Sequence, residues 1–258
     1  MSSLKKSWVG ILWPRDTMRT PSNHPGLGRL IAGMVLVILV SVFLAESYAW
    51  FERRLSGEEA PWLGALIVNG TIAFCAILVW LRRPHWGLIP APRWHRFSLL
   101  SPGGRLMLAF APAAAVLTLT MIMGFVSQAF GHAERSFRFT HSQWIFVLVV
   151  PVVEEWSFRV GLGYFFRRLS GSLWGGYFSA MLFSMVHSLP TWSRVLDLKI
   201  GLLPGPLFLG ILCEALLLMT GRVLPAIALH MACNATVIIF TVMDGRWLKW
   251  LDFLYVGR

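Results

Sequence analysis

The sequence has few charged residues, few acidic residues in particular, and few cysteines. Charged residues make up 14% of the 258 residues and only 12 are acidic, whereas soluble domains are about a quarter charged. This shortage, with 56% hydrophobic residues and a mean hydropathy of +0.64, excludes an ordinary soluble enzyme, a disordered chain and a coiled coil. Cys75, Cys213 and Cys233 have no zinc-binding or C-x-x-C spacing, so we expect them to serve packing.

Long apolar runs are abundant, and about 20 mostly apolar residues are enough for a helix to cross a bilayer. Seven such runs predict an all-α, polytopic membrane helix bundle, with spans at residues 30–50, 62–81, 106–126, 144–165, 173–189, 200–219 and 224–243. The fifth run is short, and Pro204 and Pro206 lie early in the sixth, so one of the seven is a candidate for a re-entrant or split segment. An eighth, half-length helix at residues 86–100 or after Trp247 is the alternative.

These runs divide the chain into four parts. We expect a flexible basic arm at residues 1–29, three spans and their connections at 30–143, a membrane core at 144–243 and a short tail at 244–258. The net charge of +11 lies largely between the apolar runs, which favours contact with anionic lipid headgroups over nucleic acid. Lys and Arg are more frequent on the side of the first arm, which predicts a cytoplasmic N-terminus. The short connections indicate a bacterial plasma membrane.

Ionisable side chains inside predicted spans are costly and usually face the bundle interior. Those spans contain Glu46, Glu154, Glu155, Arg159, His187, Glu214, His230 and the polar Asn234.

Three of these residues form a motif in the fourth span. Glu155 and Arg159 are four residues apart and can pair on one helical face. Glu154 points about 100° away, so its carboxylate stays free to act as a general base. The alternative is a buried ion cluster that only holds helices together.

The seventh span places His230 and Asn234 on one face, four residues apart. At about 1.5 Å per residue, Glu154 and Asn234 both fall near the middle of the bilayer, and His230 lies one turn nearer the cytoplasm. His187, at the end of the fifth span, comes out nearer the outer edge and fits this convergence least well.

The three motifs Glu-Glu-x-x-x-Arg, Phe-x-x-x-His and His-x-x-x-Asn, in this order on successive membrane helices, resemble the CPBP family. These are the type II CAAX prenyl endopeptidases and their bacterial relatives, also called the ABI family. The resemblance covers residues 144–243. It implies an intramembrane glutamate-dependent endopeptidase with no metal and no cofactor, acting on a membrane-embedded or lipidated polypeptide.

Carried over by motif, the resemblance also implies a role for each matching residue. Glu154 is the base that activates water, with His187 as its partner. His230 and Asn234 donate hydrogen bonds to the oxyanion. Glu155 and Arg159 are a supporting pair, and Phe183 packs the site. Ser157 and Cys233 occupy variable motif positions.

Four other interpretations remain open. Glu154, His187 and His230 could hold a zinc ion, although the chain has no H-E-x-x-H motif. The bundle could be a non-catalytic immunity or scaffold protein. Glu46 and Glu214 could mark a proton path in a transporter, although we expect them near span ends or on interior faces with neighbouring partners. Cys233 and His230 could form a covalent dyad.

Overall fold

The computed structural model describes residues 26–55, 61–91, 99–129, 140–187 and 203–242. All regular secondary structure in these segments is helical, which confirms the predicted all-α membrane bundle. Outside these segments lie most of the predicted arm and tail and the region after Trp247. The ends of three predicted spans also lie outside them, at residues 188–189, 200–202 and 243. In the connection after Arg82, the described residues 83–91 contain one 3₁₀ turn, and residues 92–98 of the candidate half-length helix also lie outside the described segments.

The helices follow the predicted spans closely. In chain order they are α2 (Leu27–Leu55), α3 (Pro61–Arg82), the 3₁₀ turn η1 (Pro84–Trp86), α5 (Pro102–Ala129), α6 (His141–Trp144), η2 (Ile145–Val149), α7 (Val150–Glu155), η3 (Trp156–Leu162), α8 (Gly163–Ser170), α9 (Ser172–His187), α11 (Pro204–Thr220) and α12 (Leu224–Val242).

Within the described segments, three helices are long and apolar enough to cross a membrane, over Leu27–Tyr48, Leu63–Arg82 and Pro102–Val126. Their outward surfaces are strongly hydrophobic: Phe43 on α2 is 70% exposed and Met107 on α5 is 78% exposed. Apolar surface on this scale needs a lipid or protein neighbour. The two shorter apolar helices, Pro204–Thr220 and Leu224–Ile239, are largely surrounded by the rest of the bundle.

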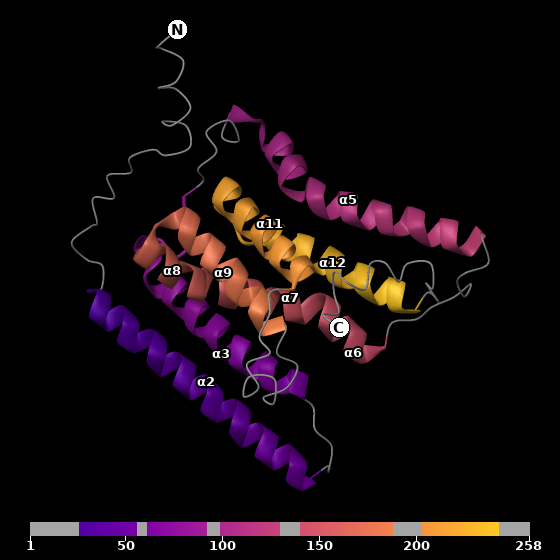
Figure 1. Ribbon diagram of the computed structural model, residues 1–258. Coiled ribbons are helices and arrows are strands. Elements are labelled where there is room, and N and C mark those ends of the chain that lie inside the picture. The colour runs from indigo at the N-terminus through magenta and orange to yellow at the C-terminus, as the bar shows by residue number, and fades with distance from the viewer. Residues whose placement is uncertain (1–25, 56–60, 92–98, 130–139, 188–202, 243–258) are drawn as a thin grey trace.

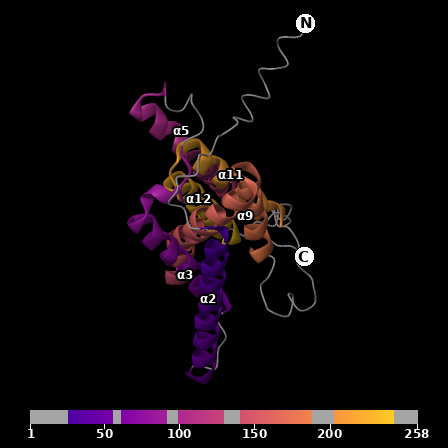
Figure 2. The same ribbon diagram turned by 90° about the vertical axis from the view of Figure 1, so that its left-hand side faces the viewer.

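The bundle is arranged around the segment from α6 to α8. α2 lies along α3, and α3 packs on α7 and η3, while α9, α11 and α12 follow in turn and α5 covers α12 (Figure 1). The C-terminal end of α2 projects past the other helices in both views (Figure 2). Two buried polar contacts join the early helices to this core, from Ser157 to Asn69 of α3 at 3.1 Å and from Thr236 to Thr120 of α5 at 2.7 Å.

The irregular span is the fourth one. The short length of the fifth run and the prolines of the sixth had made those two the candidates for a split segment. Two π-helical stretches, η2 and η3, flank the six-residue α-helix α7. Pro204 does not break the sixth span, because it is the first residue of α11 and follows the extended Leu203, a position that suits proline. Single π-helical turns occur often at functional sites, and here they lie on both sides of the Glu154–Glu155 pair.

Close helix contacts at α9 depend on two glycines. A Cβ at Gly175 would collide with the backbone of Arg167, and a Cβ at Gly176 would collide with the side chain of Glu214. The first obstacle is main chain and cannot move aside, so a side chain at this position would force α8 and α9 apart.

We therefore expect Gly175→Ala to destabilise the protein by about 1–3 kcal/mol through overpacking. The measurement is the thermal unfolding midpoint of the purified protein in detergent at one heating rate. Gly70→Ala is the matched control, because nothing lies within 4 Å of a Cβ there, and alanine at a helical position is neutral or stabilising. Equal midpoints for Gly175→Ala and the unmodified protein would contradict the close packing of α8 on α9.

Candidate active site

The Glu155–Arg159 pair lies at the centre of the bundle, as the four-residue spacing predicts. Arg159 Nε donates to Glu155 Oε2 at 3.1 Å, and both side chains are fully buried. Arg159 Nη1 also donates to Ser179 Oγ of α9 at 3.3 Å. A buried carboxylate is stable as an ion only when it is paired and hydrogen-bonded, and Glu155 meets both conditions.

His230 lies between the two glutamates. Its Nδ1 is 2.9 Å from Glu155 Oε1, and its Nε2 is 3.6 Å from Glu154 Oε2. Since the ionised Glu155 can only accept hydrogen bonds, Nδ1 carries a proton and donates it. In the neutral ring Nε2 is then the unprotonated nitrogen, and it faces Glu154.

Glu154 differs from its neighbour in lacking a close partner. Its Oε2 is buried without a hydrogen-bond partner among the described residues, and the nearest imidazole nitrogens lie beyond hydrogen-bond range. His187 Nε2 is 3.9 Å away, and His187 Nδ1 lies 2.8 Å from the carbonyl of Phe183. Because a carbonyl only accepts, the neutral ring of His187 also presents an unprotonated Nε2 to Glu154.

Phe183 packs these groups together, which is the position that the motif implies for it. Its ring is edge-to-face with His230 at 5.5 Å and 4.3 Å from the ring of His187. The guanidinium of Arg159 lies over the same ring at 4.9 Å. One aromatic side chain therefore fixes both histidines and the supporting arginine.

Asn234 lies one turn beyond His230 on α12, and its side chain reaches the segment just before α7. Its Nδ2 donates to the carbonyl of Phe146 in η2 at 3.0 Å. A primary amide has two N–H groups, so one remains for another acceptor. The carbonyl that holds Asn234 belongs to one of the two π-helical stretches.

The predicted set therefore converges across four elements, with Glu154 and Glu155 on α7, Arg159 on η3, Phe183 and His187 on α9, and His230 and Asn234 on α12. His187 was expected to fit this convergence least well, and the structure brings its Nε2 to 3.9 Å from Glu154 Oε2.

A second buried ion pair escaped the sequence reasoning. Arg167, which lies just beyond the predicted fourth span, is buried and its Nη1 donates to Glu214 Oε1 at 2.7 Å. Its Nη2 donates to the carbonyls of Leu88 and Arg159 at 3.1 and 2.7 Å. The expectation that Glu214 has a partner inside the bundle is confirmed. The sequence did contain a signal for Arg167, because it follows Arg159 by about two helical turns and so lies on the same helical face.

Glu46, the other glutamate outside the motifs, lies on an exposed face of α2.

The structure also bears on the covalent dyad, on the metal site and on the cysteines. Both nitrogens of His230 face carboxylates, which disfavours a dyad with Cys233. Within the described residues, no group of three or more His, Cys, Asp or Glu side chains is arranged to hold a metal ion. Cys213 is fully buried in an apolar cluster of α11 and α12, as expected for a packing role.

The fold and site define an integral membrane protein with a buried glutamate–histidine cluster. Residues 136–236 match the family model described as Type II CAAX prenyl endopeptidase Rce1-like. The match contains the whole Glu154–Asn234 site and is consistent with the CPBP/CAAX protease family, whose members are membrane endopeptidases and therefore hydrolases. Among curated proteins and solved structures, none matches the chain.

The Arg167–Glu214 pair yields a stability prediction. Arg167→Met leaves Glu214 buried without its cation, and breaking a buried pair costs about 3–5 kcal/mol. We expect a much lower yield of folded protein in size-exclusion chromatography. Arg168→Met, at the half-buried neighbouring position, is the control and should fold normally. Adding Glu214→Leu to Arg167→Met should restore part of the yield, because the unpaired carboxylate is then removed. Equal yields from Arg167→Met and Arg168→Met would contradict the assignment.

Proposed function

We propose that the protein is an intramembrane glutamate-dependent endopeptidase in which Glu154 activates a water molecule. The observation that carries the proposal is the free Oε2 of Glu154, buried and faced by Nε2 of His230 at 3.6 Å and of His187 at 3.9 Å. Polar atoms at such distances are suited to sharing a bridging water. A water in that place would be within reach of three proton acceptors, Glu154 Oε2 and the Nε2 atoms of His187 and His230.

Hydrolysis then proceeds in two proton transfers. Glu154 takes a proton from the water as its oxygen attacks the scissile carbonyl carbon, which produces a tetrahedral oxyanion. The same carboxyl group returns the proton to the leaving amine as the carbon–nitrogen bond breaks. His187, whose Nδ1 is held by the carbonyl of Phe183, orients the water through Nε2.

The oxyanion needs donors that are already in place. The second N–H of Asn234 is one candidate, since its first is used by Phe146. His230 can be the other only when its ring is doubly protonated, because its Nδ1 proton is already directed at Glu155. In this scheme Glu155 and Arg159 are positioning residues that act through His230.

The exposure of the site residues supports an approach route for the substrate. The side chain of His187 is 32% exposed and that of Glu154 is 13% exposed, while Glu155 and Arg159 are fully buried. A polypeptide therefore approaches from the His187 side, at the end of α9. We propose a membrane-embedded or lipid-anchored polypeptide, cut at a CAAX-type tail, a sorting signal or a precursor segment.

We also propose that the N-terminus lies in the cytoplasm and that the host membrane is a bacterial plasma membrane. The excess of Lys and Arg on the side of the first arm supports the orientation.

Glu154→Gln tests the function directly. We expect cleavage to fall by about 10²–10⁴-fold, the usual contribution of a general base, because the amide cannot accept the proton. The readout is the set of new C-termini of membrane proteins in cells that express each variant, followed by peptide cleavage with purified protein. Glu46→Gln, an exposed carboxylate on α2, is the control and should retain full activity.

Two outcomes would contradict this proposal. If cells that express Glu154→Gln behave like cells that express the unmodified protein, an immunity or scaffold role is favoured. Loss of activity with a zinc chelator and its recovery with added zinc would favour a metal held by Glu154, His187 and His230. The glutamate mechanism predicts full activity after chelation.

A further inference from the structure

A large cavity lies outside the active site, between α2, α3 and the segment that leads into α8. Its volume is about 960 Å³, at the upper end of the range for ligand sites. The wall is mostly apolar, with Met34 and Val37 from α2 and Ile72, Ala76 and Val79 from α3. None of the proposed catalytic residues lines it.

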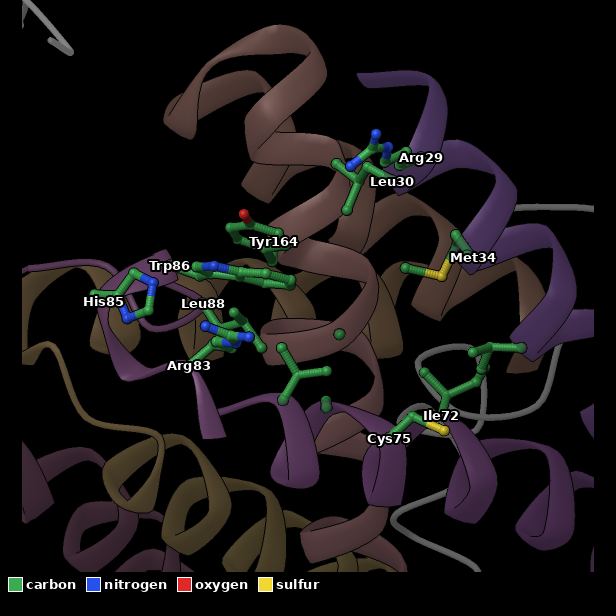
Figure 3. Close-up of a pocket in the computed structure, with 15 residues that line it drawn as sticks. Arg29, Leu30, Met34, Ile72, Cys75, Arg83, His85, Trp86, Leu88 and Tyr164 are labelled. Atoms are coloured by element: carbon green, nitrogen blue, oxygen red, sulfur yellow. The ribbon is translucent and has the colours of Figure 1, made fainter. Parts of the chain in front are cut away.

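One end of the cavity is basic. Arg29, Arg83 and His85 line that end. In Figure 3, Tyr164 and Trp86 lie between Arg29 on one side and Arg83 and His85 on the other, while Ile72 and Cys75 lie on the opposite side of the cavity. The cavity is therefore amphipathic, with cations and aromatic rings at one end and aliphatic side chains at the other.

The basic end coincides with a membrane boundary. α2 and α3 cross in opposite directions, and the apolar spans begin at Leu27 and end at Arg82, so Arg29 and Arg83 lie at the same surface. From there the lining extends about 12 Å along α2 to Val37 and about 16 Å along α3 to Ile72. This is close to half of a hydrocarbon core about 30 Å thick, which is the depth of one leaflet.

A buried polar atom points to a ligand independently of the charge. The hydroxyl of Tyr164 lies within this lining, is buried and has no hydrogen-bond partner among the described residues. A buried unsatisfied hydroxyl costs free energy. A phosphate or ester oxygen at the basic end of the cavity would accept its proton.

We propose that this cavity binds one anionic phospholipid of the surrounding leaflet, with an acyl chain between α2 and α3. The phosphate contacts Arg29 and Arg83, and Tyr164 donates to a headgroup or ester oxygen. The site is separate from the proteolytic centre, so its occupancy does not depend on the proposed protease activity.

The test is native mass spectrometry of the full-length protein in detergent with phosphatidylglycerol or phosphatidylcholine of identical acyl chains. We expect retained phosphatidylglycerol adducts and few phosphatidylcholine adducts. Arg29→Ala and Arg83→Ala should each weaken phosphatidylglycerol binding roughly fivefold, and Tyr164→Phe should weaken it without lowering the unfolding midpoint. Arg222→Ala removes an exposed arginine outside the cavity and should leave binding unchanged.

Filling the cavity provides a second, charge-independent arm. Gly33 lines the cavity and has nothing within 4 Å of a Cβ, so Gly33→Phe should fold and block the acyl chain. Gly70→Phe, equally open but outside the lining, is the control and should bind normally. Equal retention of the two lipids, or undiminished binding by Gly33→Phe, would overturn the proposal. Displacement of phosphatidylglycerol by inorganic phosphate alone would assign the site to a free anion instead.

Discussion

The buried pair of Glu155 and Arg159 is the constraint on which the site depends. An unpaired charge in a bilayer interior is costly, and this pair brings two opposite charges together at 3.1 Å. The pair also binds the neighbouring helices, since Arg159 donates to Ser179 of α9 and Glu155 accepts from His230 of α12. With one carboxylate neutralised in this way, its sequence neighbour is left as the unpaired group. The different roles of two adjacent glutamates follow from which of them faces the arginine.

The segment that carries the two glutamates is interrupted on both sides. α7 is only six residues long and lies between two π-helical stretches, so the groups on either side are not arranged as on a straight helix. The Arg167–Glu214 ion pair supports the C-terminal end of this segment, because Arg167 binds both Glu214 and the carbonyl of Arg159. The two buried pairs thus stabilise one segment at two levels, and Gly176 leaves the space that Glu214 occupies.

Much of the fold and the site was predictable because both rest on local patterns. Apolar runs located the helices, and four-residue spacings placed Glu155 with Arg159 and His230 with Asn234. Three features were not predictable. The π-helical turns have no simple composition signal, the position of His187 depends on how α9 packs in the bundle, and Arg167 lies just beyond the predicted fourth span. The buried role of Arg167 is set by Glu214, 47 residues away, and such a pairing is visible only in three dimensions.

The central claim is that Glu155 is structural and Glu154 is free, and unfolding midpoints of Glu155→Gln and Glu154→Gln measured side by side test it most directly. Glu155→Gln leaves Arg159 buried without its anion, a loss of about 3–5 kcal/mol, and should lower the midpoint by many degrees. Glu154→Gln removes a buried carboxylate without a close partner and should leave the midpoint unchanged or raise it. The reverse order, or equal losses in both variants, would contradict the account.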